Sequence, residues 1–304
     1  MVANEWAFFH RWEEDNPMPQ PLSERIDQMA VEIQTPHGEP IQVLSLDQTA
    51  LLATQFELPR QRVEIVSLEK GVIPTRYLRN QKTMTAADQA RLLKTRAAII
   101  GLGGLGGTVV EILARAGVGQ MVLVDGDRFE EHNLNRQLLC AQHLIGYEKA
   151  RAAQERINQI NSALQAEAQV EFLTAENASR LIQNCDVVVD CLDNIFARFD
   201  LETAAKQAGI PMVGAAVAGV AGHVTTIFPQ DKGLELIYGP RHSIQREKGA
   251  ETILGCLPQA VTMIAAMESA QVLKILLKQS KGLLRNKLWV VDLTDNTFEV
   301  LSLI

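Results

Sequence analysis

A glycine-rich turn at residues 101–106 (GLGGLG) fits the pattern G-x-G-x-x-G and stands between a predicted strand and a predicted helix. Glycines in such a turn let the backbone approach phosphate, the amides of the following helix face it, and an acid ending the next strand binds the ribose hydroxyls. The nucleotide-binding residues predicted from this motif are Gly101, Gly103, Gly104, Gly106 and Asp125. The motif predicts nucleotide binding but does not distinguish ATP from NAD.

The segment after Asp125 carries residues suited to a triphosphate. Asn133 and Arg136 lie in DGDRFEEHNLNRQ, and Lys149 stands at the start of the next predicted helix. ATP carries about twice the negative charge of a dinucleotide's pyrophosphate, and phosphoryl chemistry needs cations that stabilise this charge. Two cations beyond the helix N-terminus therefore favour ATP over NAD.

Two acids, Asp190 and Asp193, follow the apolar strand predicted at 186–189. The ligand crevice of a doubly wound sheet lies at the carboxyl ends of its strands, where one carboxylate and nucleotide phosphates can hold Mg²⁺. Asp193 is the predicted magnesium ligand, because Asp190 can instead cap the strand end. A turn formed by Asp193 and Asn194 is the structural alternative.

Alternating strands and helices after residue 90 must position these side chains. Strands are predicted at 96–100, 120–125, 168–173, 186–190, 211–219, 223–229, 287–293 and 297–304, and helices at 107–117, 147–160 and 257–277. An irregular segment covers 230–254. This order predicts a doubly wound, Rossmann-like α/β fold with a mostly parallel sheet and antiparallel strands at its C-terminal end.

Residues 1–75 are predicted to form an arm and a small α+β appendage, ahead of an ATP-binding domain at 76–304. The arm carries aromatic residues (Trp6, Phe8, Phe9, Trp12), followed by prolines at 17, 19 and 21 that indicate a short linker. Strands at 31–36 and 41–46 around a turn at 37–40, a helix at 47–56 and a strand at 62–68 give the order β-β-α-β.

Composition argues against several classes of protein. A formal net charge of −7 argues against a general nucleic-acid binder. Apolar runs such as 212–222 are too short to span a bilayer, and the N-terminus lacks a cationic stretch leading into an apolar one, so a cytoplasmic protein is expected. The cysteines at 140, 185, 191 and 256 form no C-x-x-C pair, so neither a disulfide framework nor a structural zinc is expected.

Five motifs in order, RYLRNQ (76–81), GLGGLGG, VDGDRFEEHNLNRQ, GYEKA and CLDN, resemble the ThiF/MoeB/HesA family, relatives of the ubiquitin-activating enzymes. The resemblance implies a homodimer that uses MgATP to adenylate the C-terminal glycine of a ubiquitin-like carrier. It assigns ribose binding to Asp125, triphosphate contacts to Asn133, Arg136 and Lys149, magnesium to Asp193, and contact with the partner subunit's nucleotide to Arg79. The predicted catalytic residues are Arg136, Lys149, Asp193 and Arg79.

The chain departs from this family's thiol-using members. The two C-x-x-C pairs of the zinc-bearing members are absent, and Glu251 stands where thiol-using members carry cysteine. The nearest thiol, Cys256, is predicted to be a packed cysteine at a helix start rather than a nucleophile. The segment from about 30 to 78 weakly resembles the first two thirds of β-grasp sulfur carriers such as ThiS and MoaD, with an unrelated appendage as the alternative.

Together these observations predict an ATP-dependent adenylyltransferase that acts on the Gly-Gly terminus of a ThiS- or MoaD-like sulfur carrier, with sulfur supplied by a separate donor. Three alternatives remain. The enzyme could adenylate a small molecule or a modified nucleoside, or the chain could be an inactive scaffold that holds a nucleotide or a carrier. An NAD oxidoreductase is disfavoured by the cations after Asp125.

Overall fold

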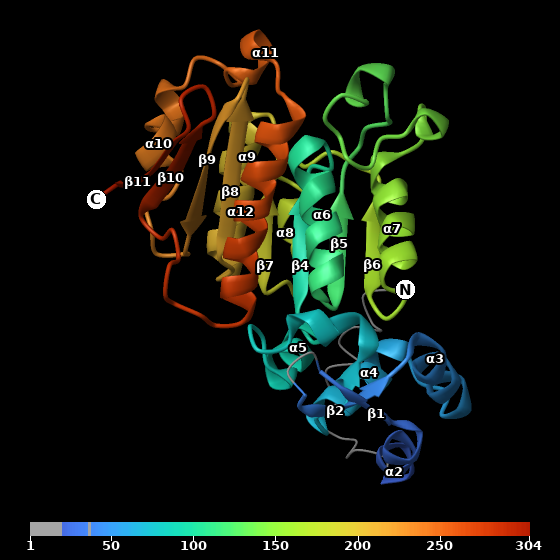
Figure 1. Cartoon of the computed structure of the whole chain (residues 1–304). Coiled ribbons are helices and arrows are strands. Elements are labelled where there is room, and N and C mark those ends of the chain that lie inside the picture. Colours follow the sequence, from blue (N-terminus) through green and yellow to red (C-terminus); the bar gives the residue numbers. More distant parts are fainter. Residues whose placement is uncertain (1–19, 36–37) are drawn as a thin grey trace. The chain divides into compact units, whose positions relative to one another are not determined.

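The computed structural model describes residues 20–35 and 38–304 (Figure 1). The chain divides into two compact units between Ala90 and Arg91, whereas the sequence predicts a boundary between residues 75 and 76. The aromatic residues of the predicted arm, its prolines at 17 and 19, residue 36 at the end of the predicted strand and residue 37 at the start of the predicted turn lie outside the described residues. The third proline, Pro21, lies in the first turn of a helix, where a missing N–H costs no helical hydrogen bond.

The N-terminal unit contains a three-stranded sheet in the order β1-β2-β3. The first two strands form an antiparallel hairpin, and β2 pairs with β3 in parallel. Its elements are α2 (Gln20–Met29), β1 (Val31–Gln34), β2 (Pro40–Leu44), α3 (Leu46–Gln55), α4 (Arg60–Glu69), β3 (Ile73–Pro74) and η1 (Thr75–Asn80), followed by α5 (Ala86–Leu93), which crosses the boundary between the units. Helices α2, α3 and α4 supply most of its apolar core.

The predicted strand at 62–68 is wrong, because these residues lie within helix α4. Their β-branched side chains favour a strand locally, but packing overrides this propensity. Val63 and Val66 both lie in the core of the unit, as expected for neighbours on one helix face. Pro59 precedes the helix and Gly71, with φ of 79°, follows it. The predicted β-β-α-β order, on which the resemblance to the carriers rests, therefore fails at its last strand.

Glu64 is a carboxyl buried inside this unit, and its Oε1 lies 3.4 Å from Nη2 of Arg76. Burial raises the pKa of Glu64 from 4.5 to about 7, although Arg76 opposes the shift. The unfolded chain therefore loses this proton at lower pH than the folded protein. We expect the free energy of unfolding to fall as pH rises from 4.5 to about 7, by on the order of 3 kcal/mol.

Urea denaturation at pH 5 and pH 8 tests this expectation, with Glu64→Gln as the matched variant. The wild type should lose about 2 kcal/mol more stability than Glu64→Gln between these two pH values. An equal loss in both proteins would show that Glu64 titrates near its ordinary pKa in the folded state.

The C-terminal unit is built on an eight-stranded sheet in the order β11-β10-β9-β8-β7-β4-β5-β6. Its first half comprises β4 (Arg96–Ile100), α6 (Gly104–Ala116), β5 (Gln120–Val124), η2 (Glu131–Asn133), η3 (Gln142–Leu144), α7 (Lys149–Ile160), β6 (Gln165–Gln169), α8 (Ala178–Leu181) and β7 (Val187–Asp190). Its second half comprises α9 (Ile195–Ala208), β8 (Met212–Ala218), β9 (Ala221–Ile227), α10 (Glu235–Tyr238), η4 (Arg241–Ser243), α11 (Glu251–Leu254), α12 (Pro258–Leu276), β10 (Lys287–Asp292) and β11 (Thr297–Ser302).

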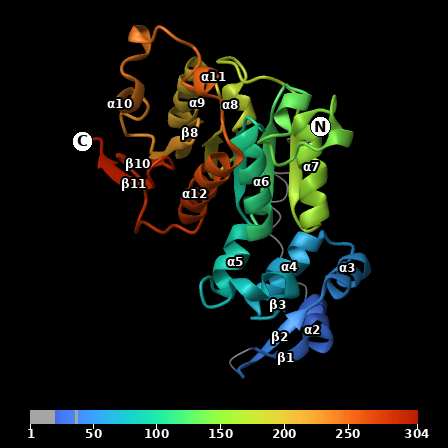
Figure 2. The same cartoon turned by 45° about the horizontal axis from the view of Figure 1, so that its top comes forward.

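Helices cover both faces of this sheet. On one face α7, α6 and α12 lie side by side (Figures 1 and 2), and α8 and α9 pack on the other. Alternate residues of β4 serve the two layers: Ala98 and Ile100 belong to the core cluster beneath α8 and α9, and Ala97 and Ile99 are equally buried. Strands buried on both faces explain the near-continuous apolar runs in the sequence.

The predicted fold class is confirmed. The five strands from β6 to β8 pair in parallel, and β8 to β11 pair antiparallel. Strand β6 begins earlier than predicted, and two short helices, α10 and α11, and the 3₁₀ turn η4 lie within the segment expected to be irregular. Helix α9 was not predicted, although Asn194 caps its first turn by accepting the Ala197 N–H and Gly209 ends it with φ of 72°.

The chain changes direction within the sheet between β4 and β7. From β4 it moves outward through β5 to β6, and then it crosses to β7 on the other side of β4. The carboxyl ends of β4 and β7 therefore form a topological switch point, where open α/β sheets bind their ligands. Among the residues that the structure describes, every helix falls short of the length and apolar content that crossing a membrane requires.

Candidate active site

A cavity of about 800 Å³ lies at the carboxyl ends of β4, β5 and β7. Eight of the residues predicted from sequence line it: Gly101, Gly103, Gly104, Asp125, Asn133, Arg136, Lys149 and Asp193. Gly106 lies within helix α6, and Arg79 belongs to η1 in the N-terminal unit. A cavity of this size can enclose a nucleotide.

The glycine turn needs two of its glycines for backbone reasons. Gly101 has φ of 90°, and a Cβ there would lie 2.7 Å from the Cys191 carbonyl oxygen at the end of β7. A Cβ on Gly106 would lie 1.8 Å from the Gly101 carbonyl oxygen. Gly103 differs, because its Cβ would lie 3.6 Å from Nε2 of Gln137, an ordinary contact distance. Gly103 is the N-cap of α6 and supplies no side-chain cap, which leaves the first amides of the helix available to a ligand.

Asp125 joins β5 to the glycine turn. Its Oδ2 accepts the Leu102 N–H at 2.7 Å, and its Oδ1 accepts the Asp127 N–H at 2.8 Å. Burial raises the pKa of Asp125, although nearby Lys149 and these two N–H donors oppose the shift. The carboxylate thus holds the turn in place, and its predicted contact with ribose remains a prediction.

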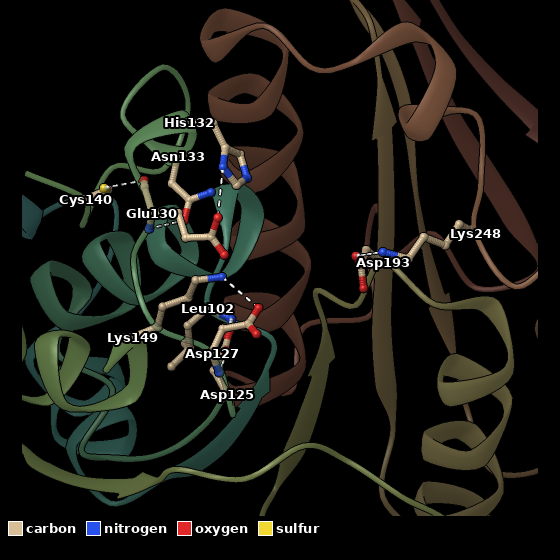
Figure 3. Close-up of polar contacts among 10 residues, drawn as sticks. All are labelled: Leu102, Asp125, Asp127, Glu130, His132, Asn133, Cys140, Lys149, Asp193 and Lys248. Atoms are coloured by element: carbon tan, nitrogen blue, oxygen red, sulfur yellow. Dashed lines mark hydrogen bonds and ion pairs between the residues drawn. The ribbon is translucent and has the colours of Figure 1, made fainter. Parts of the chain in front are cut away.

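Lys149 reaches the cavity from the first residue of α7. Its Nζ lies 3.0 Å from Oδ2 of Asp127, and its side chain is 8% exposed whereas that of Asp127 is 54% exposed (Figure 3). Sequence reasoning missed Asp127, although it stands two residues after the predicted ribose acid. The cation is therefore fixed in a largely buried position with its partner at the solvent-facing side.

The segment after β5 shapes the adjoining wall. Asn133 is buried, and its Oδ1 accepts the Glu130 N–H at 3.0 Å, which fixes the 3₁₀ turn η2. The Arg136 guanidinium donates to Oδ1 of Asn135 at 2.9 Å and to the His132 carbonyl at 3.1 Å. Asn133 and Arg136, two of the three residues predicted to contact the triphosphate, both line the cavity.

The acids after β7 have different environments. Asp190 is fully buried, accepts the Leu192 N–H and lies 3.2 Å from Nη1 of Arg198. Its carboxylate therefore caps the end of strand β7. Asp193 is 69% exposed in the cavity wall, and its Oδ2 lies 3.3 Å from Nζ of Lys248 (Figure 3).

A buried polar group beneath the site escaped sequence reasoning. Glu268 on α12 is fully buried, and its Oε2 accepts a hydrogen bond from Sγ of Cys191 at 3.7 Å. Burial raises the pKa of Glu268 well above its ordinary value, and the neighbouring Asp190 adds to the shift. Its spacing from the apolar residues Ile264, Ala265 and Val272, which places it on the same helix face as these buried side chains, was the sequence signal that could have indicated it.

The sequence profile of the ThiF family matches residues 77–303. This chain belongs to the ThiF family. The SAMP-activating enzyme E1 of Haloferax volcanii is 32% identical over 213 residues, which cover 69% of this chain and 77% of that protein. The sulfur carrier protein ThiS adenylyltransferase of Escherichia coli strain K12 is 31% identical over 189 residues, which cover 62% of this chain and 74% of that protein.

Solved structures show the same fold. Escherichia coli MccB with ATP superposes with a TM-score of 0.65 at 21% identity, over 75% of this chain and 71% of that chain. Microcin C7 biosynthetic enzyme MccB in complex with N-formylated MccA gives a TM-score of 0.66 at 17% identity, over 93% of this chain and 87% of that chain. Membership of the ThiF family confirms the resemblance seen in the motifs, and the chain is an adenylyltransferase of the ThiF type that uses ATP.

Cys256, the thiol nearest in sequence to the position occupied by Glu251, lies in the cavity wall directly before the N-cap of α12. Its Sγ lies 3.4 Å from the Val217 carbonyl oxygen. Burial raises the pKa of the Cys256 thiol, although Arg136 opposes the shift. A thiol with a raised pKa is a weak nucleophile at neutral pH.

We therefore expect Cys256→Ser to keep wild-type rates of pyrophosphate release, within about twofold, because the thiolate that a covalent step requires is disfavoured. Pyrophosphate release and intact-mass spectra under non-reducing conditions check this, with Cys140→Ser, outside the cavity wall, as the control. A carrier adduct on the wild type that disappears in Cys256→Ser would contradict the expectation.

Proposed function

We propose that this chain uses MgATP to adenylate the C-terminal glycine carboxylate of a small ubiquitin-like sulfur carrier. The observation that carries the proposal is the convergence of the glycine turn, Arg136, Lys149 and Asp193 on one cavity at the switch point. The names of the relatives support the acceptor class, since one is a SAMP-activating enzyme and another is a ThiS adenylyltransferase.

The chain's own groups bind the triphosphate from several directions. The first amides of α6 face the cavity beside Gly103, and Arg136 and Lys149 add two cations in its wall. The helix N-terminus and both cations stabilise negative charge on phosphate oxygens. Asp125 lines the same cavity directly after β5, and in this proposal its carboxylate binds the ribose.

The reaction requires an ionised carboxylate to attack the α-phosphorus. A bond forms between a carboxylate oxygen and this phosphorus, and the bond from the α-phosphorus to the oxygen that bridges to the β-phosphorus breaks. Pyrophosphate leaves with the bond's electron pair, and an acyl-adenylate remains. No proton must move in this step, so charge stabilisation by Arg136 and Lys149 and alignment of the reactants supply the catalysis.

Mg²⁺ suits the carboxylate of Asp193. Among the described residues no three His, Cys, Asp or Glu side chains gather as a metal-binding group. Magnesium at nucleotide sites commonly takes one or two carboxylates, with phosphate and water oxygens completing the coordination. The exposed carboxylate of Asp193 in the cavity wall fits this arrangement, and the ion would neutralise phosphate charge there.

The proposal extends to a homodimer in which Arg79 contacts the partner subunit's nucleotide, and to a separate protein that donates sulfur. If Arg79 acts across the dimer, Arg79→Ala and Lys149→Ala subunits should be inactive alone and should recover up to a quarter of wild-type activity when mixed, since half of the dimers are then hybrids with one complete site. Verified hybrids without recovered activity would place Arg79 outside the partner's site.

The test of the proposed function is exchange of labelled pyrophosphate into ATP, dependent on a carrier protein that ends in Gly-Gly. A carrier with an amidated C-terminus serves as the control, because it lacks the attacking carboxylate. Calorimetry with MgATP and with NAD⁺ tests the nucleotide independently. Exchange without any carrier, or tight binding of NAD⁺ without binding of MgATP, would contradict the proposal.

A further inference from the structure

Lys248 lies in the cavity wall beside the predicted magnesium ligand. Backbone pairing fixes its segment there, since Asn194 and Lys248 form an antiparallel bridge and the Ile195 N–H donates to the Glu247 carbonyl at 2.6 Å. From this position Nζ of Lys248 reaches Oδ2 of Asp193 at 3.3 Å. Figure 3 shows this pair on a different side of the site from Lys149 and Asp127.

Two other cations of the wall, Arg198 and Lys149, are more firmly engaged. Arg198 is buried against Asp190 and donates to the carbonyl oxygens of Ala215 and Leu192. Lys149 is largely buried against Asp127. In contrast, both partners of the Lys248–Asp193 pair are more than half exposed, at 55% and 69%. An exposed ion pair contributes only about 0 to 1 kcal/mol, so Lys248 can exchange its partner at little cost.

Adenylation creates a need for such a cation. The acceptor's carboxylate is an anion, and it must approach an α-phosphate that also carries negative charge. A cation beside the two anions offsets the repulsion between the carboxylate and the α-phosphate, and it orients the attacking carboxylate oxygen. Arg136 belongs to the segment after β5, and Lys149 pairs with Asp127 of that segment. Lys248 instead pairs with Asp193, which follows β7.

We infer that Lys248 binds the acceptor's carboxylate, and that it holds Asp193 only until a divalent cation takes that side chain. The inference rests on the proposed function and adds an acceptor-binding residue to it. Lys248 and the metal compete for one carboxylate, so occupation of Asp193 by the metal releases the ammonium group to the acceptor. Metal and acceptor carboxylate therefore bind with positive coupling.

The metal half of the inference is tested without any acceptor. Mn²⁺ binding to the full chain is measured by electron paramagnetic resonance in the presence of α,β-methylene-ATP. Lys248→Met should bind Mn²⁺ about twofold to fivefold more tightly than the wild type, because the competing ammonium group is gone. Arg246→Met removes a cation from the same segment outside the cavity wall and should leave the affinity unchanged. Unchanged or weaker Mn²⁺ binding by Lys248→Met would overturn the competition.

The acceptor half compares a Gly-Gly carrier with the same carrier amidated at its C-terminus. With Mg²⁺ and the ATP analogue present, amidation should weaken binding to the wild type by roughly tenfold or more, since a charge-assisted hydrogen bond is lost. Lys248→Met should bind both forms alike, and Lys248→Arg should restore part of the difference. A full amidation effect in Lys248→Met would overturn the inference. If the wild type binds neither form of the carrier, the proposed carrier substrate is contradicted. The Mn²⁺ measurement alone would then show whether a metal ion displaces Lys248 from the Asp193 carboxylate.

Discussion

Lys149→Ala should lower carrier-dependent pyrophosphate exchange by about 100-fold to 1,000-fold, the range expected when one preorganised group that stabilises transition-state charge is removed. The side chain of Lys149 is only 8% exposed and lies in the cavity wall. Because a largely buried cation is poorly screened by water and salt, its effect on developing phosphate charge is large.

The fold should tolerate this change. The partner carboxylate of Asp127 is 54% exposed and can be solvated when the ammonium group is lost. The matched control is Arg151→Ala, which removes another cation of α7; Arg151 is 58% exposed, pairs with Glu148 and does not line the cavity. Exchange kinetics and melting temperatures of both variants check the prediction. A Lys149→Ala variant within threefold of wild-type turnover would show that the triphosphate binds elsewhere.

Local sequence patterns were sufficient to predict most of the larger unit. Apolar runs such as 96–100 and 187–189 become strands buried on both faces, and the glycine turn occurs where a strand ends and a helix begins. Helix α4 shows the limit of such patterns. Its β-branched residues favour a strand, and the contacts that make it a helix come from distant parts of the N-terminal unit.

The location of the site was easier to predict than the side chains that pair with its residues. Motif spacing placed Lys149 and Asp193 at one cavity, because the carboxyl ends of neighbouring strands meet at one edge of a sheet. It did not indicate Lys248, which is separated from Asp193 by 55 positions and belongs to a segment expected to be irregular. Pairing of this kind depends on how the chain returns to the sheet after β9, which no local motif encodes.

The glycine turn allows phosphate binding to be separated from folding. Gly106→Ala should destabilise the protein by several kcal/mol, since its Cβ would lie 1.8 Å from the Gly101 carbonyl oxygen and the helix would have to move away from the strand. Gly101→Ala should cost about 1 to 2 kcal/mol for the left-handed backbone alone, and its contact with Cys191 at 2.7 Å adds to this.

Gly103→Ala should leave the melting temperature close to that of the wild type, because the new Cβ meets Nε2 of Gln137 at an ordinary 3.6 Å. ATP affinity should nevertheless fall by roughly tenfold or more, since the methyl group stands at the N-cap of α6, where phosphate oxygens must approach the first amides. Thermal melts and calorimetric titration with MgATP measure the two effects separately. If Gly103→Ala folds and binds MgATP as the wild type does, the phosphates do not lie on this turn. If Gly106→Ala has the same melting temperature as the wild type, the close approach of α6 to β4 is not required for the fold.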